Sequence, residues 1–228
     1  MTPHPAPSPT RGEGKSTQRY LAIETSSARL SLALGDEARI RATLTGRHDW
    51  RHAESLFAGI EKLLRRVRWP IQSLTGVAVS IGPGSFTGIR IGLAAARALG
   101  QSLMIPVVGV SSLEAMAAGA RTGARWMAPQ IDALRGQIFG ALFERCGSRG
   151  VRRVLKESMD FPDVWKKEIG RHIGRESLWI SPLKGCYPEA GVLLELARPR
   201  LAAGSPESYK SALPLYIRQA AAVERKRC

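Results

Sequence analysis

The sequence has few cysteines and no long apolar run. Its three cysteines, Cys146, Cys186 and Cys228, are far apart and show neither C-x-x-C nor metal-ligand spacing, so they predict a protein with reduced thiols. No apolar run approaches the roughly 20 residues that a membrane span needs, and the N-terminus has no apolar signal-peptide core. These absences favour a cytoplasmic protein that makes no use of a membrane.

Acidic residues are also scarce relative to basic ones. There are 34 Lys and Arg against 19 Asp and Glu, which gives a formal net charge of +15. A basic balance of this size favours association with nucleic acid or another polyanion. The basic residues are nevertheless spread along the chain, and no basic ladder with interleaved aromatics, typical of single-strand binding, is present. Any RNA contact is therefore expected to be weak or indirect, through basic surface residues such as Arg152, Arg153, Lys166 and Lys167.

The N-terminal 18 residues are rich in Pro, Ser and Thr and have almost no apolar content, which predicts a disordered tail. Residues 12–17 resemble the end of a Walker A motif. A P-loop needs glycine where Pro9 stands, and it needs a strand before the loop rather than after it. The tail is therefore not expected to bind a nucleotide.

The residues after the tail predict a mixed α/β protein. Apolar runs at 20–23, 30–34 and 39–44 indicate a three-stranded β-meander, and residues 52–67 have the periodicity of an amphipathic helix. The meander indicates an antiparallel edge on a parallel sheet. Further strands are predicted at 74–81, 107–110, 127–132, 137–143 and near 178, and further helices at 93–101, from 111 and at 190–201.

Residues 82–92, Gly-Pro-Gly-Ser-Phe-Thr-Gly-Ile-Arg-Ile-Gly, lie between the strand at 76–81 and the alanine-rich helix at 93–101. A strand, a glycine-rich turn and a helix N-terminus in this order can form an anion site, because unpaired backbone N–H groups point outward there. Ser85 or Thr87 is expected to cap the helix. A tight turn that binds nothing explains the same residues equally well.

The helix after this turn carries Gly92, Ala96 and Gly100 at i, i+4 and i+8. Small side chains at this spacing leave one helix face nearly bare, so that another helix can approach closely. His48 and His52 have the spacing of a helical metal pair. No third ligand is evident, and a capping or interface role for the histidines is preferred.

Several short segments in the same order resemble the bacterial TsaB (YeaZ) family. The resemblance covers residues 20 to about 218 and is strongest up to Leu113. The matching segments are 21–26 (LAIETS), 52–56 (HAESL), 82–90 (GPGSFTGIR), 108–113 (VGVSSL), 131–133 (IDA) and 214–218 (PLYIR).

This resemblance implies an α/β fold of the actin/Hsp70-like type (ASKHA, RNase H-like), with two small lobes of mixed sheets flanked by helices. The N-terminal lobe is expected at 19–111. The C-terminal lobe, with a basic insert and a C-terminal tail, is expected at 112–228.

The resemblance also implies a role in forming N6-threonylcarbamoyladenosine at position 37 of tRNAs that read ANN codons. In that system the related subunit TsaD transfers the threonylcarbamoyl group. TsaB binds TsaD and, with the ATPase TsaE, supports turnover as a non-catalytic subunit that can also form homodimers.

Two positions depart from the catalytic relatives. TsaD-type sequences carry a metal-binding H-x-x-x-H after the strand that follows the glycine-loop helix, and here Ser112 and Met116 stand in those places. Neither side chain is a competent ligand for zinc or a hard divalent ion. Glu24 replaces the aspartate that is usual in the first turn. We therefore expect no catalytic residue, no metal and no cofactor in this chain.

The lead hypothesis is docking onto TsaD, or onto a second copy, by helix–helix packing. The residues expected at that interface are His52, Leu56, Phe86, Arg90, Gly92, Ala96 and Gly100. The alternatives are an independent nucleotide-binding or peptidase-like enzyme, in which Ser85 and Glu24 would line a cleft, and a tRNA-binding adaptor. No Ser/His/Asp or Cys/His set at recognisable spacing supports a peptidase.

Overall fold

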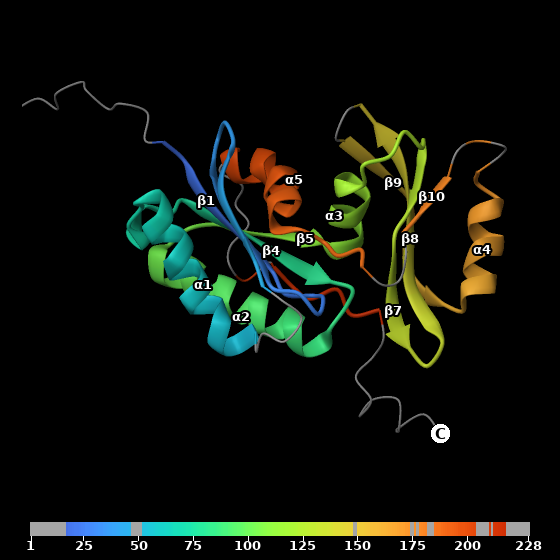
Figure 1. Cartoon of the computed structure of the whole chain (residues 1–228), viewed down its shortest axis with the longest axis horizontal. Coiled ribbons are helices and arrows are strands. Elements are labelled where there is room, and N and C mark those ends of the chain that lie inside the picture. The colour runs from blue at the N-terminus through green and yellow to red at the C-terminus, as the bar shows by residue number, and fades with distance from the viewer. Residues whose placement is uncertain are drawn as a thin grey trace, which may run out of the picture.

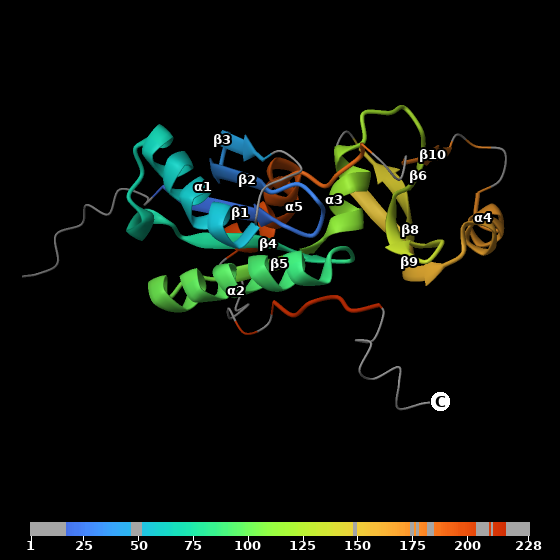
Figure 2. The same cartoon turned by 60° about the horizontal axis from the view of Figure 1, so that its bottom comes forward.

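A computed structural model describes residues 17–46, 52–147, 150–173, 176, 178–181, 185–203, 210 and 212–217, with the backbone alone for 52–54. Nearly all of the predicted tail therefore lies outside the described residues, and so does His48. Figures 1 and 2 show two sheets side by side, with helices on their faces and one helix, α3, between them. In the described part of the chain, no helix has both the length and the apolar composition to cross a bilayer.

The first sheet has the strand order β3-β2-β1-β4-β5. The meander strands pair antiparallel, whereas β4 and β5 continue the sheet in parallel with β1. This confirms the predicted antiparallel edge on a parallel sheet. The strands are β1 (Arg19–Glu24), β2 (Ser31–Asp36), β3 (Ile40–Thr45), β4 (Gly76–Gly82) and β5 (Val107–Ser111).

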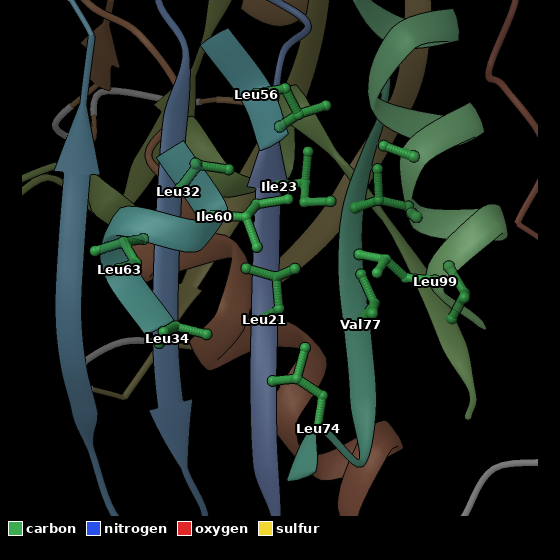
Figure 3. Packing of buried hydrophobic residues seen from close by; sticks show 14 of the residues in the cluster. Leu21, Ile23, Leu32, Leu34, Leu56, Ile60, Leu63, Leu74, Val77 and Leu99 are labelled. Atoms are coloured by element: carbon green, nitrogen blue, oxygen red, sulfur yellow. The ribbon is translucent and has the colours of Figure 1, made fainter. Parts of the chain in front are cut away.

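Helices cover both faces of this sheet. α1 (His52–Val67) and α2 (Phe86–Leu103) lie on one face, and α5 (Ala190–Ala202) lies on the other (Figure 1). Because side chains alternate across a strand, Leu21 and Ile23 join the core under α1 and α2, whereas Tyr20 and Ala22 join the core under α5. Figure 3 shows the first of these cores, where leucines and isoleucines of α1 interdigitate with those of β1 and β2.

The second sheet has the order β10-β6-β8-β7, and β9 also pairs with β8. The single strand predicted at 127–132 is split in two, because Pro129 has no N–H group to donate to a ladder. α4 (Pro162–Gly170) packs on one face of this sheet, where Trp165 lies against Gly140. The strands are β6 (Trp126–Ala128), β7 (Gln130–Leu134), β8 (Gln137–Cys146), β9 (Gly150–Asp160) and β10 (Leu178–Ile180).

The helix α3 (Ser112–Gly119) belongs to both cores. Ala115 packs in the core under α5, and Leu113 and Met116 pack in the core of the second sheet with Phe139 and Phe143. A short 3-10 turn, η1 (Ile71–Ser73), completes the described elements between α1 and β4. The two halves of the molecule are therefore joined through a shared buried helix.

The chain does not divide into lobes at one point in the sequence. Ser111 and Ser112 do mark the passage from β5 to α3, but α5 returns to the first sheet and packs on β1 and β2. Residues 212–217 also return, and Ala212 is buried in the core under α2. The assignment of everything after residue 111 to a C-terminal lobe is therefore wrong for α5 and for the segment that follows it. The physical reason is burial, because Leu193, Leu194 and Leu201 fill the apolar core on this face of the first sheet.

The helix α2 begins seven residues earlier than predicted, at Phe86 rather than Leu93. Ser85 caps it, as predicted, by accepting a hydrogen bond from the Gly88 N–H at 3.2 Å. Gly88 and Gly92 are thus inside the helix. A Cβ atom at Gly88 would lie 1.9 Å from the carbonyl oxygen of Thr25, so the helix needs glycine there to reach β1.

We predict that Gly88→Ala destabilises the protein by about 3 kcal/mol through steric overlap with a backbone carbonyl that cannot move freely. Helix propensity alone favours alanine by about 1 kcal/mol, so the sign of the change separates the two effects. Urea unfolding gives the free energy. Gly170→Ala in α4 is the control, because a Cβ atom there has no neighbour within 4 Å. Equal stability of the two variants would contradict the packing explanation.

Candidate functional site

The turn after β1 holds a fully buried carboxyl group. Glu24 is 0% exposed, and its Oε1 accepts hydrogen bonds from the Ser26 N–H and the Ser26 hydroxyl, both at 2.6 Å. Its cross-strand neighbour is Ser31 on β2, and Ser80 occupies the matching level of β4. Within the described residues, Glu24 Oε2 and Ser80 Oγ have no hydrogen-bond partner.

Burial raises the pKa of Glu24 from 4.5 to about 7, and the hydrogen bonds from Ser26 oppose that rise only in part. The Ser80 hydroxyl is near enough to lower this pKa a little, but it does not reach hydrogen-bonding geometry with Oε2. A carboxyl group with such a pKa can hold a proton at neutral pH. Because the side chain is wholly enclosed, it does not present that proton to a substrate in this structure.

The glycine turn packs against this β1 turn. Gly82 and Gly84 have φ values of 99° and 152°, which residues with a side chain rarely adopt. The N–H of Ser85 donates to the carbonyl of Ser26 at 2.6 Å, and the N–H of Ile89 donates to the Ser85 carbonyl at 2.9 Å. The bond from Ile89 is the first i→i−4 bond of the helix itself. Of the N–H groups before it, that of Ser85 joins the turn to the β1 turn, and that of Gly88 donates to the Ser85 cap. The turn thus uses part of its anion-binding capacity for contacts within the chain.

The structure places most of the predicted interface residues in the interior. Leu56 and Ala96 are 0% exposed, and Gly92 and Gly100 are buried. The small-residue face of α2 packs on the chain's own sheet, where a Cβ atom at Gly92 would lie 2.2 Å from Thr25 Oγ1. The prediction that this face is left bare for a partner is therefore wrong. The small residues of this face instead let α2 approach the chain's own β1.

Phe86 and Arg90 remain on the surface, and they lie on the outward face of α2. That face continues along the helix through further exposed residues at helical spacing, namely Thr87, Ala94, Ala98 and Gln101. It was not identified from the sequence, because alanines occupy both sides of this helix and no pattern separates the inner from the outer row. The His52 side chain lies outside the described residues.

The C-terminal segment 212–217 runs beside α2, as the red trace in Figure 2 shows. Two hydrogen bonds hold it in place. Arg97 donates to the carbonyl of Ala212 at 2.7 Å, and the Leu215 N–H donates to the carbonyl of Ile81 at 2.8 Å. Its location was not predicted, although residues 214–218 form one of the segments shared with the TsaB family.

An aromatic–guanidinium cluster lies where this segment meets the start of α2. Arg90 Nε donates to the Tyr216 hydroxyl at 3.0 Å, and the guanidinium lies 3.8 Å from the centre of the Phe86 ring. The Phe86 and Tyr216 rings are 5.2 Å apart. About two fifths of each aromatic side chain is exposed, 41% for Phe86 and 44% for Tyr216. The cluster is thus an ordered, partly apolar surface that carries a positive charge.

Two arginines expected to contact RNA are in ion pairs. Arg152 pairs with Glu144, and Arg153 lies 3.1 Å from both Glu114 and Glu157. Hydrogen bonds from Arg152 and Arg125 hold the pKa of Glu144 below its usual range. These carboxylates reduce the positive potential that β9 offers to a polyanion.

The positions that hold histidines in TsaD-type sequences are occupied by packing residues. The Ser112 hydroxyl donates to the carbonyl of Pro83, and Met116 is 3% exposed in the core of the second sheet. The described residues contain no group of three or more His, Cys, Asp and Glu side chains placed to hold a metal ion.

Comparison with known proteins agrees with this fold. Residues 48–166, a little over half of the chain, match the family model described as TsaD, tRNA N6-adenosine threonylcarbamoyltransferase. The tRNA threonylcarbamoyladenosine biosynthesis protein TsaB of Escherichia coli (strain K12) is 27% identical over 88% of this chain and 94% of its own length. The TsaB protein of Bacillus subtilis (strain 168) is 37% identical, but only over 54% of each chain.

Solved structures extend the match to nearly the whole fold. YeaZ from Pseudomonas aeruginosa superposes with a TM-score of 0.72 at 25% identity, over 87% of this chain and 99% of that chain. Another structure, described as similar to the peptidase YeaZ of the same organism, gives a TM-score of 0.75 at 26% identity. Two mixed sheets flanked by helices thus define an α/β protein of the actin-like type. The chain belongs to the family that the TsaD model describes, and within it to the TsaB/YeaZ group.

We predict that Glu24 makes the protein less stable as the pH rises. The folded state binds its proton more tightly than the unfolded chain, so the stabilisation is complete below pH 4.5 and is lost as the pH rises to about 7. This difference between the two pKa values corresponds to about 3 kcal/mol in the free energy of unfolding. Urea unfolding between these pH values measures it, with Glu24→Gln as the comparison. If the Glu24→Gln variant keeps the pH dependence of the parent, another group is responsible.

Proposed function

We propose that this protein is a non-catalytic subunit in the formation of N6-threonylcarbamoyladenosine in tRNA. In this role it binds a TsaD-type transferase, supports its turnover together with a TsaE-type ATPase, and forms homodimers in their absence. Membership of the TsaB/YeaZ group supports the pathway. The observation that carries the docking role is the outward face of α2.

This face has the composition of a protein-binding surface. Phe86 and Arg90 are at one end of the helix, and aromatic residues and arginine are enriched at interface centres. Ala94 and Ala98 follow on the same side, and their small side chains let a second helix approach closely. On the neighbouring helix α1, Phe57 is 55% exposed. α2 therefore offers small and aromatic exposed side chains with one ordered cation, and α1 adds Phe57 beside charged residues such as Lys62 and Arg66.

The Arg90 guanidinium is ordered before any partner arrives. Its contacts with Phe86 and Tyr216 restrict a side chain that otherwise loses considerable rotamer entropy on binding. A carboxylate or carbonyl group of the partner would find this donor already oriented. Pre-organisation of this kind favours docking.

Non-catalytic status is supported by how α3 is used. Ser112 and Met116 serve hydrogen bonding and packing inside the chain, so residues at those positions fix the helix between the sheets. A hydroxyl and a thioether do not suit a hard divalent ion. The transfer chemistry is accordingly assigned to the partner.

We predict that Ala94→Arg weakens binding to a TsaD-type partner at least tenfold, because a long charged side chain prevents close helix approach. The protein should still fold, since Ala94 is exposed. Co-elution with the transferase and tRNA modification by the mixture measure the effect. The same substitution at Ala96 would not serve, because Ala96 is in the core.

The matched control is Ala202→Arg. Ala202 is an exposed helical alanine in α5, on the opposite face of the first sheet. The control variant should bind the partner as the parent does. If Ala94→Arg also co-elutes and supports modification at the parent level, the partner docks elsewhere and the proposed use of α2 is wrong.

A further inference from the structure

A cleft of about 160 Å³ opens between the two halves of the molecule, on the face of the first sheet opposite α2. The chain that enters α5 passes beside α3 here in both views (Figures 1 and 2). One wall is α3, with Ala115 and Met116. The other side is formed by the start of β2, the end of β3 and residues 185–189, which lead into α5.

The cleft carries one charge of each sign. Arg29 and Glu189 both line it, and within the described residues neither has an ion-pair partner. Arg29 is held in place, because its guanidinium lies 5.1 Å from the centre of the Tyr187 ring. Glu189 is close enough to Cys186 to contribute to the raised pKa of that thiol, although burial is the larger cause. The two opposite charges thus face one space without neutralising each other.

A buried hydrogen bond joins the two segments of chain that carry Arg29 and Glu189. Ser31 is 4% exposed, and its Oγ accepts a hydrogen bond from the N–H of Ala190, the first residue of α5, at 3.1 Å. Arg29 is two residues before Ser31, and Glu189 directly precedes Ala190. The Ser31 hydroxyl hydrogen has no acceptor among the described residues, so it can donate to a group in the cleft.

We propose that this cleft binds a small zwitterion of the α-amino-acid class. The ligand's carboxylate would accept from Arg29 and from the Ser31 hydroxyl, and its ammonium group would donate to Glu189. The apolar wall of α3 would contact the side chain. The carboxylate of Glu189 disfavours a simple anion, and Arg29 disfavours a simple cation, so a ligand with both charges is the complementary choice. The volume suits a molecule of this size.

This site is separate from the docking face. Arg29 and Glu189 lie on the α3 and α5 side of the first sheet, whereas α2 lies on its other face (Figure 1). Failure of the ligand proposal would leave the docking proposal intact, and the reverse also holds.

The test is titration of the full-length protein with L-alanine, followed by NMR shifts and by the thermal unfolding midpoint. We expect saturable binding and a rise in the midpoint. Propionate, which lacks the ammonium group, and ethylamine, which lacks the carboxylate, should each bind at least tenfold more weakly. Propionate binding as tightly as L-alanine would overturn the zwitterion assignment.

Two variants locate the ligand. Arg29→Met and Glu189→Gln should each weaken L-alanine binding roughly tenfold, equivalent to the loss of one charge-assisted hydrogen bond. Both residues are exposed, so the unliganded unfolding midpoint should stay near that of the parent. Arg66→Met is the matched control, because Arg66 is an exposed arginine on α1, across the sheet. Absence of saturable binding, or an equal loss with Arg66→Met, would overturn the proposal.

Discussion

The fold depends on one close contact between two pieces of backbone. The carbonyl oxygens of Thr25 and Ser26 point into the start of α2, where Cβ atoms at Gly88 and Gly84 would lie 1.9 and 2.1 Å from them. Only glycine allows this approach. It sets the distance between β1 and α2, and it brings the Ser85 N–H within 2.6 Å of the Ser26 carbonyl. The main role of the glycine turn is therefore to join α2 to β1 through this close backbone contact, hereafter the joint.

That joint explains why one helix can serve two surfaces. Its inner row, with Gly92 and Ala96, is so small that the helix lies almost on the sheet. Its outer row, with Ala94 and Ala98, is free. On the opposite face of the sheet, α3 and α5 hold the second half of the molecule and form the walls of the cleft. The two proposed binding functions are thus separated by the thickness of one sheet.

The sequence predicted the elements well where periodicity was strong. The helix α1 begins and ends at the predicted residues, and the three meander strands lie within one or two residues of their expected positions. Ordered motifs identified the family. Prediction was wrong where residue type does not decide position. An alanine-rich helix does not reveal which row faces the sheet, and a glycine spaced for a loop also fits a tightly packed helix start.

Long-range contacts could not be predicted from the sequence. No pattern in residues 190–202 indicates that their leucines pack on β1. No pattern in residues 212–217 indicates that Tyr216 contacts Arg90. The unusual pKa of Glu24 likewise depends on complete enclosure by elements far away in the sequence. The assignment of His52, Phe86 and Arg90 to a partner interface stays a prediction, since no partner is present to test it.

The return of α5 and of residues 212–217 to the first sheet has a consequence for synthesis on the ribosome. The strands β1 to β5 emerge early, but one face of their sheet lacks its cover until α5 has been made, and Ala212 fills the other core later still. Part of the apolar surface of the first sheet therefore stays uncovered while the second half of the molecule is translated. The half that begins first is thus completed only after the second half has been made.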